Sequence, residues 1–325
     1  MTDVTYRPLG NSGLVVSTIG LGCNNFGMKL DDAGTKAVVD AALDAGITLF
    51  DTADVYGGQA GHGASETLLG QALGSRRDEI VLATKFGMDM QGANGPDWGA
   101  RGSRRYIRRA VEASLRRLQT DHIDLYQYHR PDGVTPLEET LAALHELVVE
   151  GKVVAIGSSN LAGWQIADAA WIALRSHSTP FISAQNHYSL LERGIEAEVR
   201  PSAVAHGVGI LPFFPLANGL LTGKYRKGHP VPAGTRLAGG RFSAWLTDDR
   251  LESVERIAAY AEERGISILD VGIGGLAAQP GVASVIAGAT KPEQVTANVA
   301  AAAWHPTADD LAALDAILPP APAQQ

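Results

Sequence analysis

The chain has 325 residues with a net charge of −8, and 45% of its residues are hydrophobic, which is the composition of an ordinary globular protein. The negative charge argues against broad binding to nucleic-acid phosphates, and no apolar run approaches the roughly 18 residues needed to cross a bilayer. A single cysteine, Cys23, excludes an intramolecular disulfide and a zinc site built from thiolates alone. We therefore expect a cytoplasmic protein, monomeric or homo-oligomeric, whose partner is a small molecule rather than nucleic acid or membrane.

Short β-branched runs alternate with longer helical patterns along most of the chain. Strands are predicted at residues 17–22, 47–51, 79–85, 122–129, 152–160, 181–186, 208–214 and 282–289. Helices are predicted at residues 32–46, 64–74 (with Ser65 as the cap), 103–118, 136–151, 162–177, 193–206, 267–278 and 292–302. Eight strand–helix repeats in this order predict an α/β protein whose parallel sheet closes into a (β/α)₈ TIM barrel. We expect this barrel to be a single domain over residues 1–325.

Three pieces are additional to the repeats. Residues 6–16 place an Asn-Ser-Gly turn between two extended runs, which predicts a β-hairpin before the barrel. Residues 217–250 form a long connection, and a loop of this length in a compact domain is usually functional. Further helices are predicted at 251–264 and 307–318, and residues 319–325 are expected to be a frayed tail.

Titratable side chains end three successive predicted strands. Asp51, Lys85 and His129 occupy these positions, and Tyr56 follows Asp51 by five residues. Each residue alone has an ordinary explanation, as a helix cap, a solvated terminus or a satisfied core group. Together they lie on the rim where the active sites of such barrels are found. Asp54, by contrast, is expected only to cap or solubilise its turn.

These four side chains suggest one class of chemistry. A phenol with a pKa of about 10 keeps its proton at neutral pH and can give it to a reacting oxygen. An ammonium from Lys85 would lower that pKa, and Asp51 would supply the counter-charge that a buried ammonium needs. His129 could orient a carbonyl oxygen or relay a proton. The pattern indicates proton donation to a forming oxyanion, as in carbonyl reduction.

Several motifs in one order resemble those of the aldo-keto reductases. They are "DTADVYG" (51–57), "ATKFG" (83–87), and the segments 114–132, 157–160, 185–191, 215–225 and 288–299. The chain is most similar to the bacterial and channel beta-subunit-like branch of this superfamily. The resemblance implies a nicotinamide coenzyme without metal, with Tyr56 as the general acid, Lys85 and Asp51 tuning it, and His129 positioning the substrate carbonyl.

The resemblance also implies which residues bind the coenzyme. Those expected near the nicotinamide are Gly22, Asp51, Ser159, Asn160, Gln185 and Phe213, the last as the stacking aromatic. Those expected along the pyrophosphate are Pro215, Leu216, Gly219, Leu221, Lys224 and Arg236, so that the 217–250 loop acts as a coenzyme clasp. Those expected at the adenosine end are Gly288, Thr290, Lys291, Gln294 and Asn298. Relatives often carry arginine near Thr290, and Lys291 is the nearest cation here; we expect NADP, with NAD as the alternative.

Three questions stay open at this level. Phe26, Phe86 and Trp98, together with Tyr56 and His129, are expected to contact substrate, although loop aromatics such as these and Trp245 can equally pack their own loops. The same barrel could instead be a coenzyme-binding redox sensor or regulatory subunit with weak reductase activity. A lyase or isomerase built on the same barrel is a third interpretation.

Overall fold

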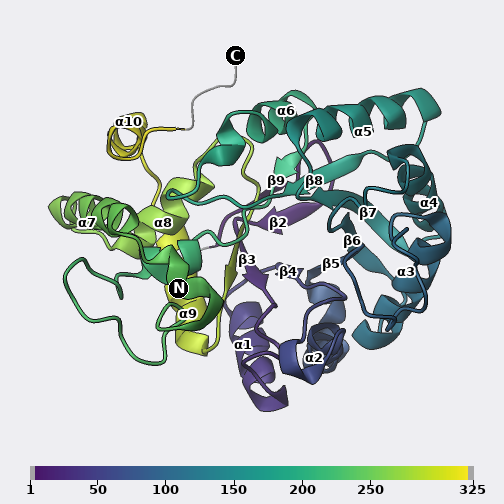
Figure 1. Ribbon diagram of the computed structural model, residues 1–325, viewed down its shortest axis with the longest axis horizontal. Coiled ribbons are helices and arrows are strands. Elements are labelled where there is room, and N and C mark those ends of the chain that lie inside the picture. Colours follow the sequence, from purple (N-terminus) through teal and green to yellow (C-terminus); the bar gives the residue numbers. More distant parts are fainter. Residues whose placement is uncertain (1–3, 321–325) are drawn as a thin grey trace.

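The structure is a computed structural model that describes residues 4–320, apart from the side chain of Arg241. Eight parallel strands form one curled sheet, surrounded by helices (Figure 1). The strands are β3 (Ile19–Gly22), β4 (Leu49–Asp51), β5 (Val81–Phe86), β6 (Ile123–Tyr128), β7 (Val153–Ser159), β8 (Phe181–Gln185), β9 (Gly209–Ile210) and β10 (Val285–Gly288). They lie in the order β10-β3-β4-β5-β6-β7-β8-β9.

The sheet closes on itself between its two ends. The backbone N–H of Ala283 donates to the carbonyl of Ile210 at 2.9 Å, and the N–H of Ile210 donates to the carbonyl of Gly281 at 2.8 Å. These bonds join β9 to the segment that leads into β10. The prediction of a (β/α)₈ TIM barrel is therefore confirmed.

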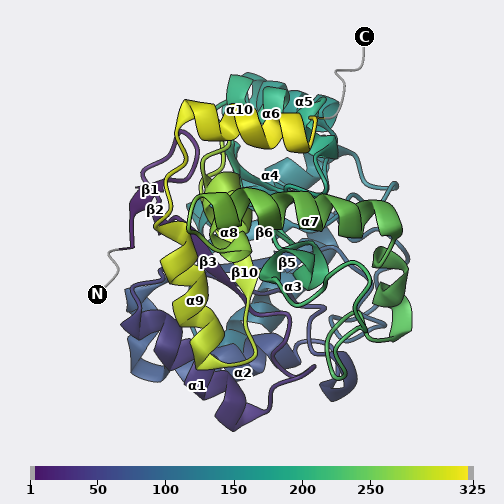
Figure 2. The same ribbon diagram turned by 90° about the vertical axis from the view of Figure 1, so that its left-hand side faces the viewer.

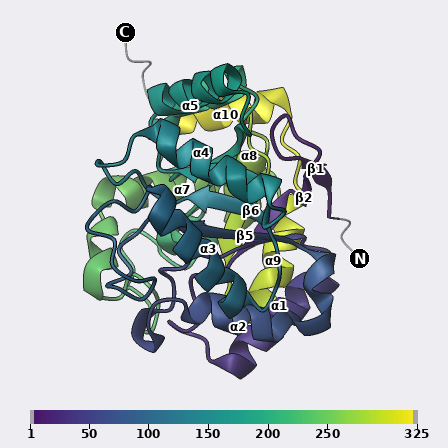
Figure 3. The ribbon, with the colours of Figure 1, turned by 90° about the vertical axis from the view of Figure 1, so that its right-hand side faces the viewer.

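Each barrel strand is followed by a helix that covers the outside of the sheet (Figures 2 and 3). These helices are α1 (Asp32–Asp44), α2 (Ala64–Leu73), α3 (Arg104–Leu118), α4 (Leu137–Val149), α5 (Gly163–Ser176), α6 (Val199–Ala205), α8 (Ile268–Ala277) and α9 (Pro292–Ala302). Helix α3 illustrates why they form. Ser103 caps its N-terminus, and Tyr106, Ile107 and Val111 lie on its buried face.

The long connection after β9 contains short 3₁₀ helices at Ala217–Thr222 and Gly240–Trp245. It leads into the extra helix α7 (Asp248–Glu263), which begins three residues earlier than predicted. Helix α10 (Ala308–Ile317) packs beside α7. Of the tail predicted at 319–325, residues 321–325 lie outside the described part of the chain.

The hairpin predicted at residues 6–16 is present as β1 (Tyr6–Pro8) and β2 (Val15–Ser17), which pair antiparallel. Leu9 and Val16 are fully buried in a cluster with the barrel residues Leu49, Ala83, Leu125, Leu211 and Ala283. The hairpin therefore seals the N-terminal end of the barrel. Arg7 ties it to the last part of the sheet, because its Nη1 donates to the carbonyl oxygens of Ala277 and Val282 at 3.0 and 2.9 Å.

Two local predictions were wrong. Helix α2 is capped by Gly63, while Ser65 is buried inside its first turn and donates to the carbonyl of Cys23 at 2.8 Å. The strand predicted at 208–214 pairs only over two residues. Its remaining residues turn toward the long connection after Ile210, where Phe213 forms only an isolated bridge with His187.

Candidate active site

The barrel register brings the predicted site residues to one rim. Asp51 lies opposite Gly22 on β3 and Ala83 on β5, while Lys85 lies opposite Gln127 on β6. Because all strands run parallel, the residues at their carboxyl ends face the same opening. Helices and the sealing hairpin cover the other sides, so this rim is the accessible end of the barrel interior.

Lys85 and Asp51 form a buried ion pair. Nζ of Lys85 lies 2.7 Å from Oδ2 of Asp51 and also donates to the carbonyl of Thr52 at 2.8 Å. Burial alone would lower the pKa of Lys85, but the charge of Asp51 together with Tyr56 outweighs it and raises the pKa. The ammonium is thus held charged beside the Tyr56 hydroxyl.

Tyr56 stands on the loop between β4 and α2, with its hydroxyl 3.4 Å from Nζ of Lys85. The loop turns sharply at Gly57, whose φ of 151° and proximity to Gly61 leave no room for a Cβ. Burial raises the pKa of Tyr56 above its ordinary value, and the opposing effect of Lys85 does not overcome it. Lys85 lowers this pKa, as predicted, but desolvation is the larger effect and the pKa stays raised.

His129 directly follows β6 and stands edge-on to Tyr56, with ring centroids 5.9 Å apart and planes at 87°. Desolvation, reinforced by the positive charges of Lys85 and Arg130, holds the pKa of His129 well below its ordinary value. Its buried Nδ1 has no hydrogen-bond partner among the described residues. The imidazole is consequently neutral and can orient a polar group, but it is not a source of protons at neutral pH.

Gln127 and Gln185 hold the second oxygen of Asp51. Their Nε2 atoms donate to Oδ1 of Asp51 at 3.1 and 2.8 Å, and both amides are buried. Gln127 was not among the predicted site residues. Its position two residues before His129 in the strand predicted at 122–129 was the available signal, because alternate residues of a strand share a face.

Asp54 is not the solvated turn residue that the sequence suggested. Its carboxyl group is fully buried, accepts from Nδ2 of Asn94 at 3.0 Å, and leaves Oδ1 without a partner among the described residues. Burial, reinforced by the nearby carboxylate of Glu66, raises the pKa of Asp54 well above its ordinary value. Arg117 bonds both Glu66 and Asn94, so a buried polar network lies behind the loop that carries Tyr56.

The predicted coenzyme residues mostly lie at the same rim. Ser159 and Gln185 pair at the ends of β7 and β8, and Gly22 pairs with Gly288 between β3 and β10. Nδ2 of Asn160 donates to Oγ of Ser159 at 3.0 Å. Thr290, Lys291, Gln294 and Asn298 lie in α9 or just before it, and Thr290 donates to Oε1 of Gln294 through its backbone N–H at 2.7 Å.

The connection after β9 supplies the remaining residues of this set. Phe213 stacks on His187 with ring centroids 5.4 Å apart, and Pro215 and Leu216 follow it into the 3₁₀ turn. Lys224 is exposed, whereas the side chain of Leu221 is fully buried in the apolar cluster beneath the loop. Only the backbone of Leu221 can therefore face a ligand. Gly219 lies two residues before it in the same turn, with φ of 99°.

Arg236 returns from the far end of the connection toward the site. Its guanidinium lies 5.9 Å from the ring centroid of Phe214 and contacts Oδ1 of Asn218 at 3.5 Å. The segment between Asn218 and Arg236 is thus folded back on itself, as a clasp would be.

Two of the side chains predicted to contact substrate are buried. Phe26 and Phe86 are fully buried, and Phe86 is stacked between Tyr126 and Tyr128 with centroid distances of 4.8 and 5.2 Å. Both rings belong to the main hydrophobic core. Trp98 is 72% exposed and lies under the guanidinium of Arg105, so it is accessible from the loop after β5.

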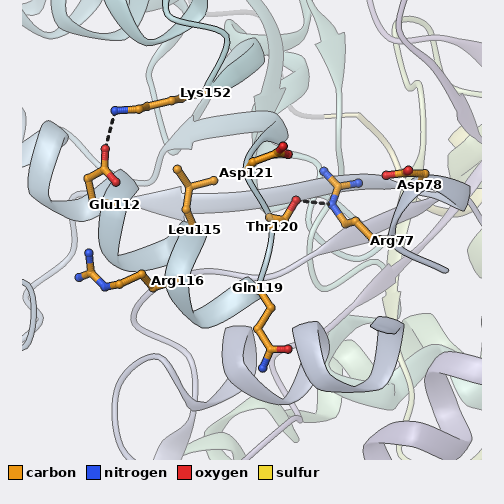
Figure 4. Close-up of a pocket in the computed structure, with 9 residues that line it drawn as sticks. All are labelled: Arg77, Asp78, Glu112, Leu115, Arg116, Gln119, Thr120, Asp121 and Lys152. Atoms are coloured by element: carbon orange, nitrogen blue, oxygen red, sulfur yellow. Dashed lines mark hydrogen bonds and ion pairs between the residues drawn. The ribbon is translucent and has the colours of Figure 1, made fainter. Parts of the chain in front are cut away.

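A hollow of about 700 Å³ lies at the opposite end of the barrel (Figure 4). Its lining includes Arg77, Thr120 and Lys152, which come just before β5, β6 and β7, and Glu112 of α3. Within it, Lys152 lies 2.5 Å from Glu112. This hollow is therefore not a continuation of the rim site.

Two general features of residues 4–320 bear on the chemistry. No helix there is long and apolar enough to cross a membrane. Within the same residues, no group of three or more His, Cys, Asp or Glu side chains is arranged to hold a metal ion.

Comparison with known proteins points to one family. The family model described as Aldo/keto reductase family matches residues 18–319. The "Uncharacterized oxidoreductase YrpG" of Bacillus subtilis is 39% identical over 300 residues, covering 91% of this chain and 90% of that protein. A "Probable voltage-gated potassium channel subunit beta" of Oryza sativa is 38% identical over 305 residues, with 91% and 90% covered. The "L-glyceraldehyde 3-phosphate reductase" of Escherichia coli K12 is 34% identical over 307 residues, with 92% and 88% covered.

Proposed function

The chain belongs to the aldo/keto reductase family and is an oxidoreductase, and we propose that it reduces an aldehyde or ketone to an alcohol with NADP as coenzyme. The observation that carries this proposal is the buried Lys85–Asp51 pair with the Tyr56 hydroxyl 3.4 Å from the ammonium. A proton donor with a raised pKa, next to a fixed positive charge, suits protonation of an oxygen that becomes negative during reduction.

The residues around the rim fit a nicotinamide nucleotide. Buried polar atoms lack partners among the described residues at Oδ1 of Asn186 and Nδ2 of Asn218, as expected where a polar ligand binds. Phe213 offers an aromatic face, and Lys224 and Arg236 offer positive charge for a pyrophosphate. When bound, the coenzyme would supply the hydride. Ser159, Asn160 and Gln185 would orient its carboxamide, and the start of α9 with Lys291 would receive the adenosine phosphate.

In this proposal the chain's own residues do four things. Tyr56 donates its phenolic proton to the carbonyl oxygen of the substrate. Lys85 stabilises the phenolate that remains, and Asp51 keeps Lys85 charged. His129, being neutral, positions the carbonyl oxygen by a hydrogen bond from its ring. Trp98, on the loop after β5, is exposed and would offer an aromatic face to the substrate.

The proposal is tested with a panel of aldehydes, ketones and sugars, each assayed with NADPH and NADH by following loss of the reduced nicotinamide. Turnover of at least one carbonyl compound with tighter binding of NADP supports it. Failure to bind either coenzyme contradicts it and favours another barrel chemistry. Tighter binding of NAD, measured by quenching of protein fluorescence, contradicts the choice of NADP and the role given to Lys291.

A second candidate function is suggested by the relatives described as potassium channel beta subunits. In it the barrel binds coenzyme tightly and regulates a partner, with reduction slow or incidental. The enzyme and the sensor are distinguished by rapidly mixing a carbonyl compound with the complex of the protein and its reduced coenzyme. Oxidation of one bound coenzyme per chain without further turnover supports the sensor, and sustained turnover supports the enzyme.

A further inference from the structure

Helix α5 lies on the outside of the barrel (Figure 1), and it carries an apolar stripe of exposed side chains. Trp164, Trp171 and Leu174 are 65%, 63% and 64% exposed. Their spacing of seven and three residues places them on one side of the helix. The opposite side, with Ile166 and Ile172, is buried against the barrel. The helix is therefore apolar on two faces, although one face is enough to hold it on the sheet.

The stripe is large enough to supply part of a protein–protein contact. A buried tryptophan side chain covers roughly 150–250 Å², so two of them about two-thirds exposed, with Leu174, present on the order of 300–400 Å². This is about half of the roughly 800 Å² that each partner contributes to a stable interface. Tryptophan is also among the residues that contribute most to binding energy at such interfaces.

The charges beside the stripe are complementary to a second copy of it. Asp168 follows Trp164 by four residues, and Arg175 follows Trp171 by four, so each charge lies beside one tryptophan. Both are exposed, and within residues 4–320 neither has an ion-pair or hydrogen-bond partner. They are seven residues apart on the helix, about 10.5 Å along its axis, which is too far for them to pair with each other.

We propose that α5 is the interface of a symmetric homodimer, in which it packs antiparallel against α5 of a second copy. A two-fold axis midway between Asp168 and Arg175 places Asp168 opposite the partner subunit's Arg175, and the reverse contact follows by symmetry. The same axis passes beside Trp171, so the two copies of this ring meet at the centre. Trp171 and Leu174 thus lie between the two ion pairs, and Trp164 lies beyond them.

The same observations argue against a membrane surface as the binding partner of this face of α5. A helix that lies on a membrane carries several Lys or Arg residues on its polar side, whereas this face pairs one Arg with one Asp. The net charge of −8 also opposes an anionic lipid surface. A self-complementary arrangement of one positive and one negative charge is what a two-fold contact requires.

The first test measures the mass of the full chain in solution by analytical ultracentrifugation over a range of concentrations. The wild-type chain should sediment as a dimer, and Trp171→Glu as a monomer with unchanged circular dichroism and unchanged activity per subunit. Val134→Glu is the matched control, because Val134 is 66% exposed on a different loop, and it should remain dimeric. A monomeric wild-type chain, or a Trp171→Glu variant that stays dimeric, overturns the proposal.

The second test checks the antiparallel register. Asp168→Arg and Arg175→Asp should each raise the dimer dissociation constant at least about 10-fold, because like charges then face each other twice. An equal mixture of the two variants should form heterodimers, since opposite charges are restored at both contacts. The double variant should dimerise as the wild type does. If neither the mixture nor the double variant recovers dimerisation, the proposed pairing is wrong.

Discussion

Nζ of Lys85 lies 3.4 Å from the hydroxyl oxygen of Tyr56 and 4.9 Å from the centroid of its ring. The ammonium is thus closer to the oxygen than to the ring face, and it bonds Asp51 more tightly than either. A positive charge placed there stabilises the phenolate more than the phenol. The contact therefore becomes stronger as the proton leaves, which is the property that a general acid needs from its neighbour.

Replacing Tyr56 by Phe should lower kcat by about 10²–10⁴-fold, because the ring remains but the donated proton is lost. The affinity for coenzyme should change little, since no coenzyme contact is assigned to the hydroxyl. Steady-state kinetics together with fluorescence titration of NADP would measure both quantities. Near-normal turnover in this variant would exclude Tyr56 as the proton donor.

Replacing Lys85 by Met should abolish most activity and also destabilise the protein, because Asp51 would remain buried without its counter-charge. Loss of one partner of a buried pair costs about 3–5 kcal/mol. The free energy of unfolding, measured in urea, and kcat should both fall. The control is Lys36→Met, since Lys36 forms an exposed pair with Asp40 whose loss should be nearly neutral. Unchanged turnover of Lys85→Met near neutral pH would remove Lys85 from the mechanism.

The pH dependence of kcat/KM for reduction should be flat through neutral pH. The active form of Tyr56 is protonated, and its pKa is raised by burial, so the rate should fall only as the pH rises above about 10. His129 should contribute no change near its ordinary pKa of about 6.5, because its depressed pKa keeps it neutral there. A fall of kcat/KM near neutral pH that disappears in Tyr56→Phe would contradict a raised pKa for Tyr56.

Replacing Gln127 by Leu should remove one of the two amide donors to Oδ1 of Asp51. A hydrogen bond to a charged group contributes about 1.5–3 kcal/mol, so the free energy of unfolding should fall by about that amount. Gln71→Leu, on the exposed side of α2, is the control and should leave stability within about 0.5 kcal/mol. Equal effects of the two substitutions would show that Gln127 is not a specific support for Asp51.

Replacing Asp54 by Asn should stabilise the protein more at about pH 8 than at about pH 5. The folded-state pKa of Asp54 is raised above its unfolded value, so its favourable contribution is complete at low pH and is lost as the pH rises through the folded pKa. Asparagine is neutral throughout and can still accept from Asn94. Urea unfolding at the two pH values measures the difference. If Asp54→Asn were equally destabilising at both pH values, Asp54 would have to be ionised and paired.

The barrel was predictable because its strands are local apolar runs that alternate with amphipathic helices. Asp51, Lys85 and His129 could be placed at one rim because each ends such a run. The environment of Asp54 could not be predicted, since its burial depends on Asn94, forty residues away, and on Arg117 of α3. Phe86 likewise looks like a loop aromatic in sequence. Its stacking between two tyrosines follows only from the register of β5 and β6.

The closure of the barrel constrains how the chain can fold during synthesis. β3 pairs with β10, and Arg7 bonds the carbonyl of Ala277 across 270 residues. Until β10 leaves the ribosome, β3 and β9 each present an unpaired strand edge, which is a template for aggregation. Contacts this distant in sequence also form slowly. The nascent chain therefore keeps these edges open to wrong pairing until β10 is made.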